Sequence, residues 1–114
     1  MIEEAELDRF LTCDTGSLIA RVKGMSATDC ENYAKAILAR IGGPTLDQYL
    51  EKLVEIMIPE GEGTPPNNPD KYYWATRSMF PHISTEEDVL GRLAGVVMKM
   101  CVLRLQQSPG SNLL

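Results

Sequence analysis

The stretch "STEEDVLGRLAGVVMKMCVLRLQQ", residues 84–107, decides the fold of this chain. At about 100° per helical residue, its apolar side chains cover almost the whole circumference. A helix of that kind is buried on most of its surface. Ser84 followed by Glu87 makes a capping box, so the pattern predicts a core helix over residues 85–106. Four of its polar residues share one narrow stripe: Asp88, Arg92, Lys99 and Gln106.

This helix has two interpretations. Either the preceding helices cover it completely, or one of its faces meets a second copy or another chain. Small residues at Gly91, Ala94 and Gly95 let a neighbouring backbone approach closely, and they fit both interpretations. The residues proposed for contact with a second chain are Leu90, Leu93, Val97, Met100 and Arg104.

The other segments also show helical periodicity, and no run of β-branched and aromatic residues bounded by turns indicates a sheet. The sequence therefore predicts an all-α fold, a compact single-domain bundle of five to six helices around the apolar C-terminal helix. A long loop is expected over 59–68 and a flexible tail over 108–114. The remaining helices are predicted near residues 3–12, 15–23, 28–41, 46–58 and 69–80.

Capping residues mark where several of these helices begin. Asp14 is placed to cap the second helix, and either Ser26 or Thr28 can cap the third, with Thr28 and Glu31 making a capping box. Thr45 with Gln48 makes a capping box at the start of the fourth. Because a short Gly-Gly-Pro turn connects the third and fourth helices, we expect them to pack antiparallel as an αα-hairpin.

The charge is acidic, with a net value of -5, and it is concentrated near the N-terminus. Phosphate backbones repel such a chain unless a local basic patch overrides the average, so nucleic acid is a disfavoured partner. The alternative hypothesis of a small regulatory nucleic-acid-binding protein needs a local basic face. The cations proposed for it are Arg21, Lys23, Lys35 and Arg40.

The cysteines and the hydropathy pattern bear on the compartment. Cys13, Cys30 and Cys101 are an odd number at spacings that match no metal site, which favours buried thiols in a reducing, cytoplasmic or otherwise intracellular setting. The N-terminus is acidic and shows no signal-peptide pattern. Arg92, Lys99 and other charges interrupt the most apolar stretch, so no membrane association is expected.

The segment "IPEGEGTPPNNPDKYYW", residues 58–74, is the candidate partner-binding region. Its loop is longer than a helix connection requires and is acidic and rich in proline. Three adjacent aromatic residues follow, and on a helix they cannot all face the same way. One interpretation places Trp74 in the core, and the other places exposed aromatic residues at an interface. The proposed contacts are Tyr72, Tyr73, Trp74, Glu60, Glu62, Pro65 and Pro66.

Stacking of these aromatic residues on single-stranded nucleic acid is a weaker alternative. Only Lys71 and Arg77 lie nearby in the sequence, and Glu60, Glu62 and Asp70 offset their charge.

Enzyme chemistry has little support in the sequence. The one histidine, His82, lies between Pro81 and Ile83 at a helix entrance, where a structural role is expected. The cysteines lie in apolar helical surroundings rather than in the electropositive setting that activates a thiolate. No phosphate-binding or nucleophile-elbow motif occurs, and the loop acids match no EF-hand spacing. We therefore expect no catalytic residues, no metal and no cofactor.

The resulting hypothesis is a non-catalytic protein-interaction, assembly or adaptor module that acts as an oligomer or docks on a larger protein. Its general layout is similar to that of small viral and phage assembly proteins. A nucleic-acid-binding regulator is the alternative, and an enzyme is the least favoured class.

Overall fold

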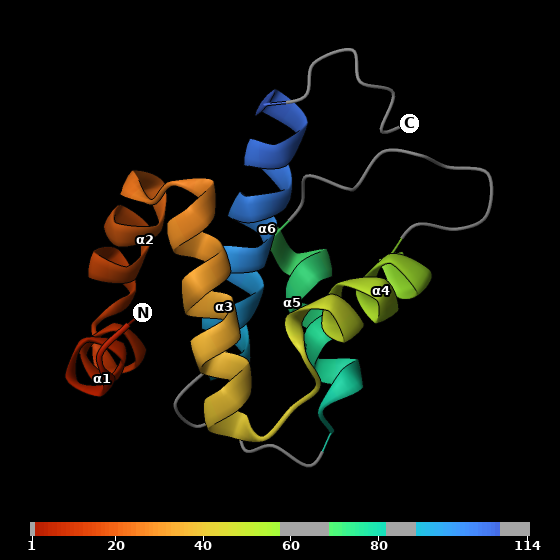
Figure 1. Ribbon diagram of the computed structural model, residues 1–114, viewed down its shortest axis with the longest axis horizontal. Helices are drawn as coiled ribbons and strands as arrows, with labels where there is room; N and C mark the ends of the chain where they lie inside the picture. Colours follow the sequence, from red (N-terminus) through yellow and green to blue (C-terminus); the bar gives the residue numbers. More distant parts are fainter. Residues whose placement is uncertain (1, 58–68, 82–88, 108–114) are drawn as a thin grey trace.

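A computed structural model of the chain describes residues 2–57, 69–81 and 89–107, and the regular structure in these ranges is all α-helical (Figure 1). Apart from the start of α6, the helix ends lie within one residue of their predicted positions. The predicted helix start at residue 85, its capping box, the loop over 59–68 and the tail over 108–114 lie outside the described residues. The helices are α1 (Glu4–Thr12), α2 (Thr15–Gly24), α3 (Ala27–Ile41), α4 (Leu46–Met57), α5 (Pro69–Met79) and α6 (Val89–Gln107).

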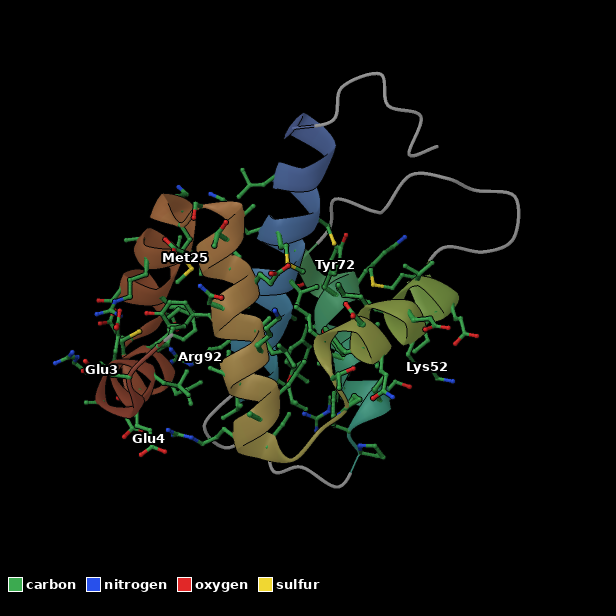
Figure 2. All side chains as sticks on the ribbon, in the orientation of Figure 1. Glu3, Glu4, Met25, Lys52, Tyr72 and Arg92 are labelled. Atoms are coloured by element: carbon green, nitrogen blue, oxygen red, sulfur yellow. The ribbon has the colours of Figure 1, made fainter. Side chains whose placement is uncertain are left out.

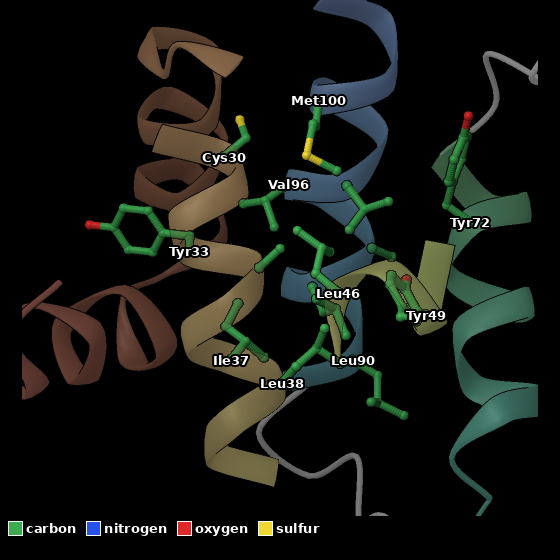
Figure 3. Close-up of a cluster of buried hydrophobic side chains, with 14 of the residues drawn as sticks. Cys30, Tyr33, Ile37, Leu38, Leu46, Tyr49, Tyr72, Leu90, Val96 and Met100 are labelled. Carbon is green, nitrogen blue, oxygen red and sulfur yellow. The ribbon is translucent and has the colours of Figure 1, made fainter. Parts of the chain in front are cut away.

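Helix α6 is the centre of the bundle, as the sequence predicts. It packs along α3 on one side and α5 on the other, and α2 also contacts it (Figures 1 and 3). The apolar core therefore forms around α6, with side chains from α1, α3, α4 and α5. The buried apolar residues that α6 contributes are Leu90, Leu93, Ala94, Val96, Val97 and Met100.

The proposed contact of α6 with a second chain is wrong for four of its five residues. Leu90, Leu93, Val97 and Met100 are each 0% exposed, because α3 and α5 of the same chain already cover this stripe. The side chain of Arg104 lies outside the described side chains. The apolar face of α6 is thus a core surface.

The polar stripe of α6 has a structural role that the sequence pattern does not show. Arg92 reaches the end of α1, where its Nη1 donates to the Phe10 carbonyl and its Nη2 to the Cys13 carbonyl, both at 2.6 Å (Figure 2). Two turns later, Lys99 Nζ donates to the Lys23 carbonyl at the end of α2, at 2.7 Å. Terminal helix carbonyls have no partner inside their own helix and favour a nearby cation. Two cations of α6 therefore cap α1 and α2.

Helices α3 and α4 do not form the expected close hairpin. Helix α3 packs mainly along α6, whereas α4 packs on α5, and Figure 1 shows α4 turning away after the connection. Gly42 adopts a left-handed conformation with φ of 72°, which ends α3. A Cβ atom added at Gly43 would lie 2.9 Å from the Phe80 ring. The residue that follows α5 thus occupies the space beside the turn.

Two of the predicted caps are confirmed by their hydrogen bonds. Asp14 accepts from the Ser17 backbone N–H at 3.1 Å and from its hydroxyl at 2.7 Å, and these bonds lower the pKa of the Asp14 carboxyl. Thr45 and Gln48 bond reciprocally, with each backbone N–H donating to the other side chain at 3.1 and 3.2 Å. The sequence therefore locates the starts of α2 and α4 correctly.

At the start of α3 the structure selects Ser26 over Thr28. The Ser26 hydroxyl accepts from the Asp29 N–H at 3.1 Å, whereas Thr28 lies inside the helix with an exposed side chain. We expect Ser26→Ala to lower the free energy of unfolding by about 1 kcal/mol. Thr28→Ala should leave it unchanged or raise it slightly, because alanine has the higher helix propensity. Urea unfolding followed by circular dichroism measures both, and a larger loss for Thr28→Ala would contradict this assignment.

Candidate interaction surface

The three adjacent aromatic residues of α5 point in three directions. Tyr72 is buried, Tyr73 is half-buried and Trp74 is 63% exposed. The interpretation that places Trp74 in the core is therefore wrong, because Tyr72 occupies that position (Figure 3). Tyr72 shares its face of the helix with Ala75 and Thr76, which are also buried.

Tyr72 is consequently not available to a partner, in contrast to the sequence-based proposal. Only 2% of its surface is exposed, and burial raises the pKa of its hydroxyl, which lies beside the Cys101 thiol. Its function is to hold α5 against α6.

The side of α5 that faces away from the core carries Lys71, Tyr73, Trp74 and Arg77, which we call the α5 patch, and the exposed Asp70 precedes it in the sequence. The rings of Tyr73 and Trp74 meet edge to face, with centroids 5.4 Å apart and planes at 76°. Arg77 Nη1 donates to the Tyr73 hydroxyl at 3.3 Å. This bond and the ring contact orient Tyr73 between its two neighbours.

The two cations of the α5 patch have no ion-pair partner within residues 2–57, 69–81 and 89–107. The ion pairs described there join Lys35 to Glu31, Arg40 to Asp8 and Lys52 to Glu55. Lys71 and Arg77 are thus positive charges beside an exposed tryptophan, in a chain whose net charge is -5.

The opposite face of α5 fixes this helix firmly in the bundle. The Tyr49 hydroxyl of α4 and the Thr76 hydroxyl share a buried hydrogen bond of 2.5 Å, and burial raises the pKa of Tyr49. The rings of Tyr49 and Phe80 lie 6.3 Å apart. The α5 patch therefore stands on a helix whose inner face is fully packed, which reduces the entropy lost when a partner binds.

The four cations of the nucleic-acid hypothesis do not gather on one face. Arg21 and Lys23 are exposed on α2, whereas Lys35 and Arg40 lie on α3. Lys35 Nζ is 3.6 Å from Glu31, and Arg40 bonds to Asp8 of α1. Two of the four charges are thus offset by carboxylates.

The other candidate residues fall into two groups. Glu60, Glu62, Pro65, Pro66 and His82 lie outside the described residues. Cys30 is buried, and burial raises the pKa of its thiol to about 11, so it carries little thiolate at neutral pH. Within the described part of the chain, no group of three His, Cys, Asp or Glu side chains is arranged to hold a metal ion.

Two open surface grooves lie elsewhere on the molecule. One, of about 570 Å³, follows the connection between α3 and α4, with Lys35 and Asp47 among its lining residues. The other, of about 460 Å³, lies between α1, α2 and α3, where the Tyr33 hydroxyl donates to Glu6 at 3.1 Å. Both linings mix charges of opposite sign, and neither includes a residue of α5.

Sequence reasoning treated Lys71 and Arg77 only as charges near the aromatic residues. Their spacing carried a stronger signal, because residues three or four apart on a helix are neighbours. Lys71 and Arg77 each lie three positions from Trp74, and Arg77 lies four from Tyr73. This spacing places all four residues of the α5 patch together once Trp74 faces outward.

Among the described helices, none is long and apolar enough to cross a membrane. Comparisons of this chain with protein-family models, with curated proteins and with solved structures find no match.

Proposed function

We propose that this chain is a non-catalytic protein-interaction module that docks on a partner protein through the α5 patch. The observation that carries the proposal is the exposure of Trp74, the one tryptophan in the sequence, at 63%. Tryptophan is usually highly buried, and an exposed one beside tyrosine and arginine has the composition of an interface hot spot.

The arrangement of the α5 patch supports this function. Tryptophan and tyrosine bury large areas with only two rotatable side-chain bonds each, so their ordering costs little entropy. The Arg77 bond to Tyr73 and the edge-to-face contact of Tyr73 with Trp74 order the patch further before binding. A partner would therefore meet a surface that is already arranged.

The surroundings of two described thiols, Cys30 and Cys13, bear on a competing catalytic function. The burial that raises the pKa of Cys30 to about 11 leaves a poor nucleophile. Cys13, by contrast, is half-buried at the end of α1, where its thiol donates to the Phe10 carbonyl at 3.3 Å and accepts from Arg92 Nη1 at 3.4 Å, so the expectation of apolar surroundings is wrong for this cysteine. The bonds of Cys13 belong to the junction at which Arg92 joins α1 to α6.

Selection from a random peptide display library tests the proposed function. We expect the wild-type chain to select binders, and we expect Trp74→Ser to weaken their binding by at least about tenfold, since tryptophan is a dominant hot-spot residue. The folded state should be unaffected, because the Trp74 side chain is mostly exposed. Binding is measured from Trp74 fluorescence for the wild type and by titration calorimetry for the variants.

The matched control is Ile19→Ser on α2, which removes another exposed apolar side chain, at 51% exposure, far from the α5 patch in the sequence. Its binding should equal that of the wild type. If no selected peptide distinguishes Trp74→Ser from Ile19→Ser, the α5 patch is not the docking surface and the proposed function is wrong.

A further inference from the structure

We infer that the α5 patch recognises an acidic peptide segment in which two carboxylates flank an apolar side chain. This inference rests on the proposed function and adds the chemistry of the partner. It is drawn from the order of side chains across α5 and from the charges around them.

The order of side chains is cation, tryptophan, cation. Lys71, Trp74 and Arg77 follow one another at intervals of three residues, so successive side chains are about 60° apart around the helix and about 4.5 Å apart along it. They form one diagonal ridge on the outer side of α5, with about 9 Å of helix between its charged ends. A segment that lies along this ridge meets a positive charge on either side of the indole ring.

The ridge carries two positive charges, and the exposed Asp70, four positions before Trp74, places one negative charge beside it. No carboxylate of the described residues lies within ion-pair distance of Lys71 or Arg77. The five donor hydrogens of the Arg77 guanidinium include one that is directed to the Tyr73 hydroxyl, an uncharged partner. In an acidic protein, two such cations beside Trp74, the most exposed large apolar side chain among the described residues, select an acidic partner and disfavour a basic one.

The tryptophan between the cations requires an apolar counterpart. An indole that is 63% exposed offers a large apolar area, and its burial provides most of the affinity that such a contact can give. The carboxylates then set the orientation and the preference, because partly exposed ion pairs contribute modestly to affinity. Two carboxylates on either side of an apolar residue match both requirements.

Single-stranded nucleic acid combines the same elements, namely stacking on aromatic rings and contacts to cations. The acidic peptide is favoured because its two carboxylates match the two cations of the ridge, whereas a polyanion brings many more negative charges to a chain with a net charge of -5. Phosphate contacts to two cations give little affinity at physiological salt, and the net charge opposes the approach of a polyanion. Mixed-sequence single-stranded oligonucleotides are therefore the competing probe in the test.

The test uses the random peptide library with three proteins: the wild type, Lys71→Glu/Arg77→Glu, and the control Arg21→Glu/Lys23→Glu. Both double variants change the net charge equally, and the control charges are exposed on α2. We expect Trp74-dependent peptides selected by the wild type to be enriched in Asp and Glu around an apolar residue. The affinity of these peptides should be about 3–10-fold weaker for Lys71→Glu/Arg77→Glu and unchanged for Arg21→Glu/Lys23→Glu. Added salt should weaken their binding to the wild type.

The outcomes separate the two proposals. Trp74-dependent peptides with neutral or basic composition would overturn this inference and leave the proposed function standing. Tighter binding of the oligonucleotide than of the selected peptides would replace the acidic peptide with nucleic acid. The absence of any Trp74-dependent peptide would remove the proposed function itself. Lys71→Glu alone, at an exposed position, gives the same comparison if the Arg77 substitution impairs folding.

Discussion

Arg92→Met is expected to lower the free energy of unfolding by about 3 kcal/mol, a large effect for a residue that the sequence pattern places on a polar stripe. Arg92 is only 8% exposed, and its guanidinium donates to two carbonyls at the end of α1. Hydrogen bonds from a charged donor contribute about 1.5–3 kcal/mol each, and a buried carbonyl left without a partner is costly. Methionine fills most of the volume but restores neither bond.

The size of this effect depends on how α1 is attached to the bundle. Leu7, Phe10 and Leu11 bury one face of this nine-residue helix, and Arg92 fixes its C-terminal end to α6. Short helices are marginal without tertiary support, so losing the cap weakens the whole N-terminal segment. The Arg92 Nε–H is buried with no hydrogen-bond partner among the described residues, which costs stability in the wild type. The expected loss for Arg92→Met therefore lies near the lower end of the range for two charged hydrogen bonds.

Two variants complete this experiment. Arg92→Lys keeps the charge but not the fork that reaches two carbonyls, so we expect it to lose roughly half as much stability. Arg9→Met removes an exposed arginine from the last turn of α1, and its effect should stay within about 0.5 kcal/mol. Urea unfolding gives all three values by linear extrapolation. An Arg92→Met value as small as that of Arg9→Met would show that Arg92 does not cap α1.

The sequence predicts best what local patterns determine. The burial of α6 follows from its own apolar circumference, and the start of α4 follows from Thr45 and Gln48, which are three residues apart. In both cases the information lies within a few turns of one helix. The start of α4 was accordingly predicted to the residue, and α6 was correctly predicted to be the central core helix.

The sequence pattern does not predict contacts between residues that are far apart in the chain. Arg92 bonds to carbonyls about eighty residues earlier in the chain, and nothing in its own helix shows that α1 ends there. The same limit explains why one interpretation placed Trp74 in the core, where the structure has Tyr72. Helical geometry requires Tyr72 and Trp74 to point in different directions, but the packing of α4 and α6 decides which of the two is buried.

The third and fourth helices show a related limit. A short turn implies that two helices are neighbours in sequence, but it does not fix which surfaces meet. Here Phe80, which follows α5, packs against the turn at Gly43, and α4 lies on α5. A residue more than thirty positions further along the chain thus lies beside the turn from which α4 leaves.

The second large effect is expected at Leu93, where Leu93→Ala should lower the free energy of unfolding by about 3 kcal/mol. Leu93 is 0% exposed at the centre of the core, so truncation removes its buried methyl groups and leaves a cavity. Since the chain itself covers this face of α6, the unfolding midpoint should not depend on protein concentration, as it would if a second copy completed the core.

Gly95, two positions further along the same helix, is the matched site with the opposite expected sign. A Cβ atom added there meets nothing within 4 Å, and alanine is the better helix former, so Gly95→Ala should raise the free energy of unfolding by about 0.5–1 kcal/mol. Urea unfolding at several protein concentrations measures both variants. A destabilising Gly95→Ala together with a concentration-dependent midpoint would mean that another backbone packs on the outer face of α6, and the description of α6 as a helix covered within one chain would then be wrong.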